Sequence, residues 1–246
     1  MLLKYFDFKQ LLLATQLYIH AAFLIGLVLI PVDMILPSLI ISHIIYVGLC
    51  GTVFYHRIVT HRNKINDKLS KFLMLLSWLG ASGSLIGWAG THRKHHTFSD
   101  TERDPHSPKY LGYIKTYWWS SGGNDIVKFV PDLLRNPWYL WQHKNYFNVL
   151  FLAHGLGLIF LPWAWYWCIM IVPGFLMWFG GSMTNCFSHN KQGPNNNILL
   201  GLLFGGEGWH KNHHNDPANA SFGHRLDWGN WIYKLITYRK SQSINV

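Results

Sequence analysis

The sequence predicts an all-α membrane protein of four transmembrane helices, arranged as two hairpins, with a cytoplasmic helical cap that carries a two-metal site. Half of the 246 residues are hydrophobic and 13% are charged, against roughly 25% charged in soluble domains. Four apolar stretches are close to the length of about 20 residues that crosses a bilayer. Nine of the 15 histidines gather near the ends of such stretches. We expect residues 1–246 to form one integral-membrane domain.

The expected spans are residues 11–30, 35–55, 146–161 and 163–183. The third is short, so we expect it to tilt less than the others or to begin earlier. The first is too long for the apolar core of a cleavable signal peptide and has no small-residue cleavage site, so we expect it to be a span. Short connections at 31–34 and at Pro162 join the spans into two hairpins.

Charge placement predicts the orientation of these hairpins. The formal net charge is +10, from 21 Lys and Arg against 11 Asp and Glu. Neither short connection contains a Lys or Arg, so all the basic residues lie on the side that holds both termini and the histidines. The positive-inside rule makes that side cytoplasmic. We expect the charge to contact anionic lipid headgroups rather than nucleic acid.

The cytoplasmic cap is expected to comprise residues 56–145 and 184–246. Within it, residues 69–88 are apolar but rich in Gly and Ser, which favours a helix lying at the membrane interface or packed on the bundle. A fifth span is the alternative, but it would place the histidines on opposite sides of the membrane. Residues 125–146 mix apolar and charged side chains at helical spacing, which predicts an amphipathic helix at headgroup level, broken near Pro137.

The histidines form three groups and one outlier, His189. Two groups share the spacing HxxHH, which places three side chains within about one third of a helix circumference: His92, His95 and His96, and His210, His213 and His214. These two triplets look like equivalent half-sites. His56 and His61 are five residues apart, about 140° on an ideal α-helix. That spacing suits a helix end, or one ligand for each of two metals.

Eight or nine imidazoles exceed the capacity of one ion, so two metals are expected. Neutral nitrogen ligands suit iron or zinc better than calcium or magnesium, and of these two only iron could activate oxygen against a C–H bond. Carboxylates beside the triplets are expected either to orient the imidazoles or to be solvated loop charges: Asp100, Glu102, Asp104, Glu207 and Asp216. Three isolated cysteines without a CxxC spacing predict neither a disulfide framework nor a thiolate site.

Four segments together resemble the signature of membrane fatty acyl desaturases, most closely the Δ9, stearoyl-type branch. They are His56-Arg-Ile-Val-Thr-His61, Trp88-Ala-Gly-Thr-His92-Arg-Lys-His95-His96, Asp104-Pro-His106 and Gly206-Glu-Gly-Trp-His210-Lys-Asn-His213-His214. In addition, Asn185-Cys-Phe-Ser-His189 resembles the Asn-x-x-x-His element that supplies a ninth ligand in that branch.

This resemblance implies that two irons are bound by His56, His61, His92, His95, His96, His189, His210, His213 and His214. Asn185 would reach a metal through water. His106 matches a family position that is not a ligand, and is expected beside the ligands together with Asp100, Asp104 and Glu207. No residue beyond the ligands is expected to be catalytic.

The implied reaction uses O₂ and two electrons to remove two hydrogens from adjacent methylenes of a long acyl chain, which gives a cis double bond at Δ9. The chain has no HPGG haem motif, flavin site or iron–sulfur cysteines, so a separate cytochrome b5- or ferredoxin-type donor is expected. Gly90-Thr91 stands where animal acyl-CoA members usually have Arg-Asp. The acyl carrier is therefore left open between CoA, a lipid and another group. Ile40 or Ile44 is expected to close the acyl tunnel.

Two other functions were weighed. A hydroxylase, acetylenase or ketolase would use the same type of di-iron centre. A non-catalytic membrane metal-binding or transport protein would need ionisable residues along the spans, where the candidates are His20, Asp33, His43 and His154. We expect His20, His43, His143, His154 and His224, which match no motif, to have structural roles.

Overall fold

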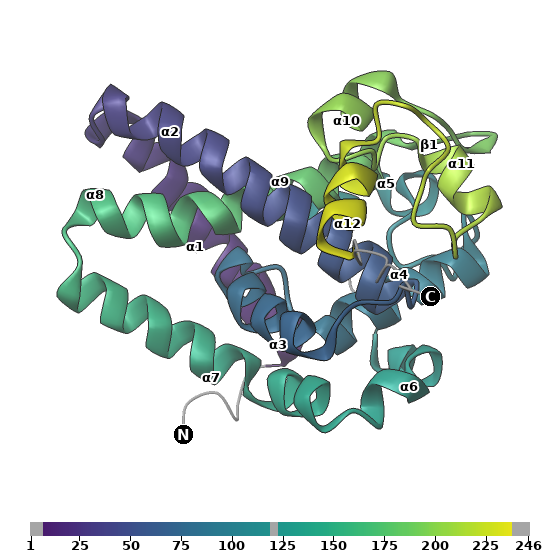
Figure 1. The fold of residues 1–246 in the computed structure, drawn as a ribbon, viewed down its shortest axis with the longest axis horizontal. Coiled ribbons are helices and arrows are strands. Elements are labelled where there is room, and N and C mark those ends of the chain that lie inside the picture. The colour runs from purple at the N-terminus through teal and green to yellow at the C-terminus, as the bar shows by residue number, and fades with distance from the viewer. Residues whose placement is uncertain (1–6, 119–122, 238–246) are drawn as a thin grey trace, which may run out of the picture.

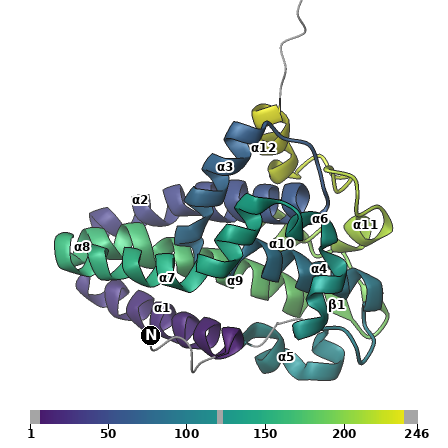
Figure 2. The same cartoon turned by 90° about the horizontal axis from the view of Figure 1, so that it is seen from below.

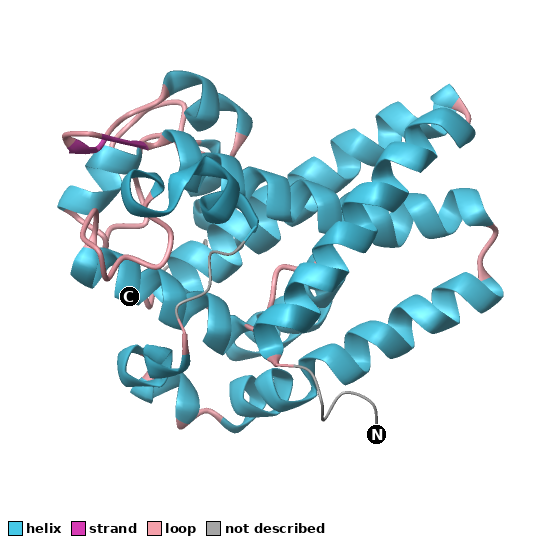
Figure 3. Ribbon diagram, turned by 180° about the vertical axis from the view of Figure 1, so that it is seen from behind, coloured by secondary structure: helices cyan, strands magenta, loops and turns pink. Residues whose placement is uncertain are grey.

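The computed structural model describes residues 7–118 and 123–237, and these are almost entirely helical (Figures 1 and 3). In chain order, with η marking 3₁₀ and π segments, the elements are α1 (Phe8–Leu29), α2 (Val32–Ser42), η2 (His43–Thr60), α3 (Asp67–Leu76), η3 (Ser77–Gly80), α4 (Leu85–Phe98), α5 (Pro108–Trp118), η4 (Asn124–Phe129), α6 (Pro131–Leu134), α7 (Pro137–Phe160), α8 (Trp163–Tyr166), η5 (Trp167–Ile171), α9 (Val172–Phe187), β1 (His189–Asn190), β2 (Gly193–Pro194), α10 (Ile198–Leu203), α11 (His210–Asn215) and α12 (Trp228–Thr237). The two short strands pair antiparallel. The predicted all-α class is confirmed.

Among the described residues, three helices are long and apolar enough to cross a membrane: Phe8–Leu29, Val32–Thr60 and Trp163–Phe187. They correspond to the first, second and fourth predicted spans: the first begins three residues earlier and ends one residue earlier than predicted, the second extends beyond both predicted ends, and the fourth extends beyond its predicted C-terminal end. The first begins at a capping box, in which the Asp7 carboxylate accepts from the Gln10 backbone N–H and the Gln10 side chain accepts from Asp7. Proline at positions 31 and 162 starts a new helix after each short connection.

The third predicted span, residues 146–161, is the second half of α7. This helix is not apolar enough to count as a span, because its first half carries a polar run, Gln142 to Asn145. α7 begins at Pro137, where the Asn136 side chain accepts from two backbone N–H groups. The predicted break is therefore present. The expected helix before it is instead two short pieces, η4 and α6, separated at Val130.

The prediction of a single helix over residues 69–88 is wrong. The chain forms α3 and η3, then turns by 86° into α4. Ala81 and Gly83 have left-handed backbone conformations, at φ 48° and 92°, and the Ser84 side chain caps the new helix by accepting from Gly87. A fourth candidate span within the described residues would have to run through this bend. The bend places α4 against η2.

The long helices lie side by side, and the two ends of this bundle differ (Figures 1 and 2). The connections that precede α2 and α8 lie at one end. The histidine-bearing helices α4 and α11 lie at the other, under the loops around β1. Large apolar side chains are exposed along the bundle's outer faces, among them Val28, Ile159 and Phe160, as expected for surfaces that contact lipid tails.

Candidate metal centre

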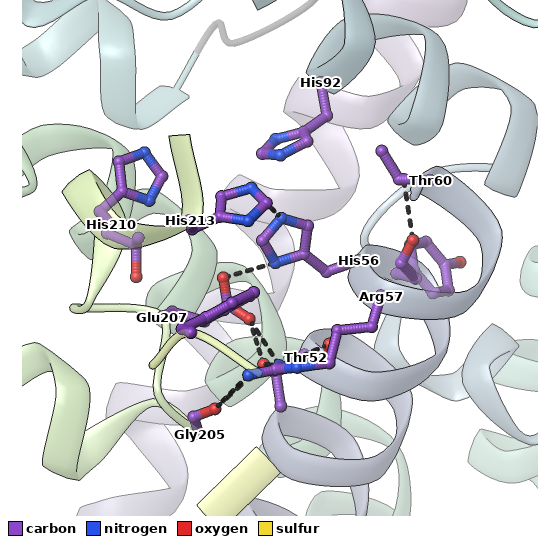
Figure 4. Close-up of polar contacts among 12 residues, drawn as sticks. Thr52, His56, Arg57, Thr60, His92, Gly205, Glu207, His210 and His213 are labelled. Atoms are coloured by element: carbon purple, nitrogen blue, oxygen red, sulfur yellow. Dashed lines mark hydrogen bonds and ion pairs between the residues drawn. The ribbon is translucent and has the colours of Figure 1, made fainter. Parts of the chain in front are cut away.

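The structure brings all nine predicted ligand histidines together from η2, α4, β1, α11 and the residue after η2. They fall into two adjacent sets, in each of which the available nitrogen atoms lie within 4.8 Å of one another. The five-histidine group is His56, His61, His92, His96 and His213. The four-histidine group is His95, His189, His210 and His214. Four of these side chains are labelled in Figure 4.

The spacing of His56 and His61 is explained by the π-helical geometry of η2. The His61 backbone N–H donates to the His56 carbonyl at 3.1 Å, an i→i+5 hydrogen bond. Such a bond brings residues five apart onto nearly the same face. Both side chains therefore enter the same group, although on an ideal α-helix they would diverge. Of the two alternatives for this pair, the structure shows the helix end, with His61 as the residue that caps η2, and not one ligand for each metal.

The two triplets are not equivalent half-sites, because each is shared between the groups. On α4, His95 belongs to the four-histidine group, although the other two members of its triplet belong to the five-histidine group. On α11, His213 belongs to the five-histidine group, although the other two belong to the four-histidine group. Each helix thus spans both candidate metal positions and fixes their separation.

The nitrogen spacing fits shared metal ions. Neighbouring Nε2 atoms lie 2.9–3.0 Å apart in the five-histidine group and 3.0–3.1 Å apart in the four-histidine group. Two ligands about 2.1 Å from one ion and about 90° apart would lie about 3.0 Å from each other, against about 3.4 Å in a tetrahedral site. The spacing therefore suits an octahedral ion better than tetrahedral zinc. His61 Nε2 is buried with no hydrogen-bond partner among the described residues.

Three carboxylates contact the rings from behind. Asp104 lies 2.9 Å from His95 Nδ1, Asp100 lies 2.8 Å from His189 Nδ1, and Glu207 lies 2.6 Å from His56 Nδ1. A carboxylate at Nδ1 keeps the proton there and turns the Nε2 lone pair toward the group. Several Nε2 lone pairs then point toward one another with no hydrogen-bond donor between them, an arrangement that a bound cation would stabilise. Glu102 and Asp216 are exposed and contact none of the nine rings.

Burial favours the neutral form of several of these imidazoles. Loss of hydration lowers the pKa of His96 to about 3 and that of His214 to about 2, and the neighbouring imidazoles act in the same direction. The pKa of His92 lies well below its usual range for the same reasons. Burial raises the pKa of Asp104 to about 6. Neutral imidazole is the form that binds metals, so the site is ready for a metal at neutral pH.

His106 and Asn185, both singled out in the sequence, also lie at this centre. The His106 ring centroid is 4.2 Å from that of His95, and its backbone N–H donates to Asp104. His106 Nε2 is buried without a hydrogen-bond partner among the described residues. Asn185 lines the same cavity as His210.

Comparison with known proteins decides the family. The chain matches no family model, but it is 34% identical over 201 residues to an sn-1 stearoyl-lipid 9-desaturase of Anabaena variabilis, which covers 74% of this chain and 71% of the relative. The chain belongs to the fatty acyl desaturases. The desaturase is also 31% identical to Delta-9 acyl-lipid desaturase 1 of Arabidopsis thaliana, over 91% of this chain and 76% of the relative. It is 28% identical to an acyl-CoA 5-desaturase, AL21, of Anemone leveillei, over 78% of this chain and 66% of the relative.

These relatives make the protein an oxidoreductase of the membrane that acts on an acyl substrate. The histidine groups are consistent with its metal cofactor. The desaturase spans about two thirds to three quarters of the length of these three relatives.

A cavity of about 560 Å³ reaches the metal centre of the desaturase. Its lining includes Phe8 and Gly83 from one side, His92 and His210 at the centre, and Met177 on α9. Small residues widen it, since Gly180, Gly181 and Ser182 follow one another along α9. Much of the lining is therefore apolar or small, as an acyl chain requires.

The prediction that Ile40 or Ile44 closes this cavity is wrong. Their side chains are 51% and 54% exposed, so they lie on the outer face of the second span. The inner face presents Val47 and Gly51 to the cavity instead. The change from α to π geometry at His43 shifts the phase of the helix, which a count of 3.6 residues per turn does not capture.

Sequence reasoning missed two arginines of the desaturase, one partly buried and one wholly buried. Arg93 pairs with Asp132 and donates to the carbonyls of Val59 and Thr60, which end η2. Arg57 is wholly buried and pairs with Asp227 and Glu207. The available signal was a cation directly beside a histidine ligand candidate within an otherwise apolar run.

The five unmatched histidines lie outside both groups. Four of them have hydrogen-bond partners elsewhere: Tyr117 for His20, the Leu203 carbonyl for His43, Ser84 for His143 and Tyr166 for His154. His224 stacks on Trp209 at 3.8 Å and accepts from the Leu226 N–H. These contacts are the structural roles expected from the sequence.

Proposed function

We propose that the desaturase holds two irons in its histidine groups and introduces a cis double bond at Δ9 of a long acyl chain, with O₂ as co-substrate. The five-histidine group would hold one iron, and the four-histidine group, with Asn185 through water, the other. When bound, the irons would supply the redox chemistry that activates O₂. The observation that carries this proposal is the cavity, because its lining includes His56, His92 and His210 next to apolar side chains.

The residues of the chain would prepare the substrate for this chemistry. The cavity walls exclude water and hold the acyl chain extended beside the cluster. Trp88 lines the cavity and stacks on the His92 ring at 5.1 Å. It would therefore fix both a ligand and the path of the chain. Asp100, Asp104 and Glu207 would keep protons on the outward nitrogens, so that the inward nitrogens remain ligands.

A lipid-linked acyl group is the carrier that we propose. The two relatives above 30% identity described here are named for acyl-lipid substrates. Gly90-Thr91 replaces the Arg-Asp pair expected of animal acyl-CoA desaturases. A Cβ at Gly90 would press against Ile126, so a larger residue there would displace the η4 segment.

For the membrane arrangement we propose four spans in two hairpins, with α7 as the third, and the cap and both termini in the cytoplasm. Residues 238–246 of this cap lie outside the described residues. The support is the position of the two connections without Lys or Arg at the end of the bundle away from the histidines (Figure 1). A separate cytochrome b5- or ferredoxin-type protein would deliver electrons to the basic cytoplasmic face.

Expression in a desaturase-deficient host, followed by lipid analysis, tests the proposed function. We expect a cis double bond at Δ9 in membrane lipids and about two irons in each purified chain. A hydroxyl or a triple bond at the same carbon atoms would instead indicate the hydroxylase or acetylenase alternative. Purified protein that binds no iron, from cells whose lipids are unchanged, would contradict the proposal.

A further inference from the structure

Arg57 makes more hydrogen bonds than any other cationic side chain among the described residues. It directly follows His56 on η2, and its side chain is 0% exposed. One terminal nitrogen donates to Asp227 at 2.7 Å and another to Glu207 at 3.3 Å. Its remaining N–H groups reach backbone carbonyls of 52, 205 and 220, and its plane lies 3.9 Å above the Phe222 ring. A buried guanidinium is tolerated only with such complete pairing.

Asp227 connects this arginine to the C-terminal helix. Its side chain is also 0% exposed. Besides Arg57, the carboxylate accepts from the backbone N–H of Asn230 at 3.0 Å, at the start of α12, and from that of Phe222 at 2.8 Å. Gly206, at φ 90°, leaves room for it, since a Cβ there would collide with the carboxylate. Asp227 therefore fixes both α12 and the loop before it.

Glu207 connects the arginine to the metal centre (Figure 4). Its carboxylate contacts Arg57 and Thr52 on one side and His56 Nδ1, at 2.6 Å, on the other. From the C-terminal loop, the Phe222 ring packs 4.6 Å from His213 and 5.5 Å from His56.

The four-histidine group has carboxylates of its own. Asp100 and Asp104 contact His189 and His95, and neither contacts Arg57 or Asp227. The buried ion pair therefore borders only one of the two metal positions. Since it joins residues 170 positions apart in the sequence, it makes the C-terminal segment part of that half of the centre.

We propose that the Arg57–Asp227 ion pair is a positioning clamp that holds Glu207 and Phe222 against His56 and His213, and so secures the metal of the five-histidine group alone. This inference rests on the proposed two-metal function. Neither residue touches the substrate cavity, so both act through the ligands.

Two variants test the clamp. Asp227→Asn removes one charge and leaves the buried Arg57 with only one of its two carboxylate partners, Glu207, which can unfold the protein. The double variant Arg57→Met with Asp227→Asn removes both charges of the pair and keeps an acceptor for one of the two backbone N–H groups, so neither position carries an unpaired charge. The matched control is Lys71→Met with Asp67→Asn, which makes the same changes at an ion pair on α3 with one exposed and one largely exposed partner.

The readouts are iron per purified chain, the electron paramagnetic resonance spectrum, and circular dichroism with size-exclusion chromatography. We expect the double variant to stay folded but to fall from about two irons to about one. Its single iron should give the spectrum of an isolated ion instead of a coupled pair. Adding Asp100→Asn to the double variant should remove the second iron as well. The control variant, Lys71→Met with Asp67→Asn, should keep both irons.

A folded double variant that keeps two irons would mean that the ion pair only stabilises the fold. Loss of both irons together would equally overturn a role confined to one group. Wild-type protein without two irons would contradict the proposed function itself, before any variant is compared. The two failures are therefore distinct.

Discussion

At the scale of single residues, nine histidines form two candidate metal groups, and the roles of individual side chains can be separated by substitution. We expect His95→Ala and His213→Ala each to abolish desaturation and lower bound iron, because each removes a nitrogen from a different group. Iron analysis and product analysis of the purified variants would check this. Full activity in either variant would contradict the site.

His154→Ala is the matched control for these substitutions. His154 is a buried histidine outside both groups, whose Nδ1 lies 2.7 Å from the Tyr166 hydroxyl. Losing this hydrogen bond should cost about 1 kcal/mol of stability, with iron content unchanged. Loss of iron from a folded His154→Ala protein would show that the two groups do not contain every ligand.

The carboxylates behind the rings give a second prediction. Asp104→Asn keeps the size of the side chain but weakens its hold on the His95 Nδ1 proton, so we expect roughly 10–100-fold lower iron affinity or activity. Glu102→Gln makes the same change at an exposed carboxylate that contacts none of the nine rings and should have no effect. Titration of iron into both apoproteins measures the difference. Equal affinities would show that Asp104 does not orient His95.

Eight of the nine histidines could be found from the sequence because they stand at local spacings, and His189 was found through its resemblance to the Asn-x-x-x-His element. The clamp could not, since Arg57 and Asp227 meet only through the tertiary fold. Sequence spacing alone does not separate Asp100, Asp104 and Glu207, which contact rings, from Glu102 and Asp216, which do not. The resemblance to the desaturases nevertheless predicted the first three beside the ligands, and the structure adds which ring each of them faces.

At the scale of elements, the second span determines which residues meet the substrate. Its inner face presents Val47 to the cavity, while Ile44 is 54% exposed on the outer face. We expect Val47→Phe to narrow the cavity and shift the preferred acyl chain to shorter lengths. Ile44→Phe adds an aromatic ring on the lipid side and should leave the preference unchanged. Competition between acyl chains of different length, followed by product analysis, would measure the chain-length preference of each variant.

A shift with Ile44→Phe but not with Val47→Phe would contradict this placement. Bulk on the second span, which suggested Ile40 or Ile44, does not show which face of the helix is turned inward. The π geometry of η2 changes both the face and the relation of His56 to His61. Similarly, the bend between η3 and α4 depends on left-handed residues at 81 and 83. The apolarity of a segment predicts that it is buried, but it does not predict the position at which a helix ends and the chain changes direction.

At the scale of the whole molecule, the metal centre and the connections without Lys or Arg lie at opposite ends of the bundle (Figure 1). If both hairpins cross the membrane, Asp33 and Lys211 lie on opposite sides of it, since Asp33 is beside the first connection and Lys211 is on α11. The positive-inside rule then puts Lys211 in the cytoplasm.

Cysteine labelling can test this orientation, once the three native cysteines are replaced. Two of these, Cys50 and Cys186, are buried, so their removal should disturb little of the surface. Asp33→Cys and Lys211→Cys both introduce a thiol at an exposed position. In a bacterial host, a membrane-impermeant maleimide should label the Asp33→Cys protein from outside intact cells and the Lys211→Cys protein only in inside-out vesicles.

The same labelling tests whether α7 crosses the membrane, because α7 falls short of the apolarity of a span. If it crosses, a maleimide should reach a thiol introduced at Trp163, which follows α7, only from the same side as Asp33. Labelling of Trp163→Cys from the cytoplasmic side would mean that α7 lies along the membrane rather than through it.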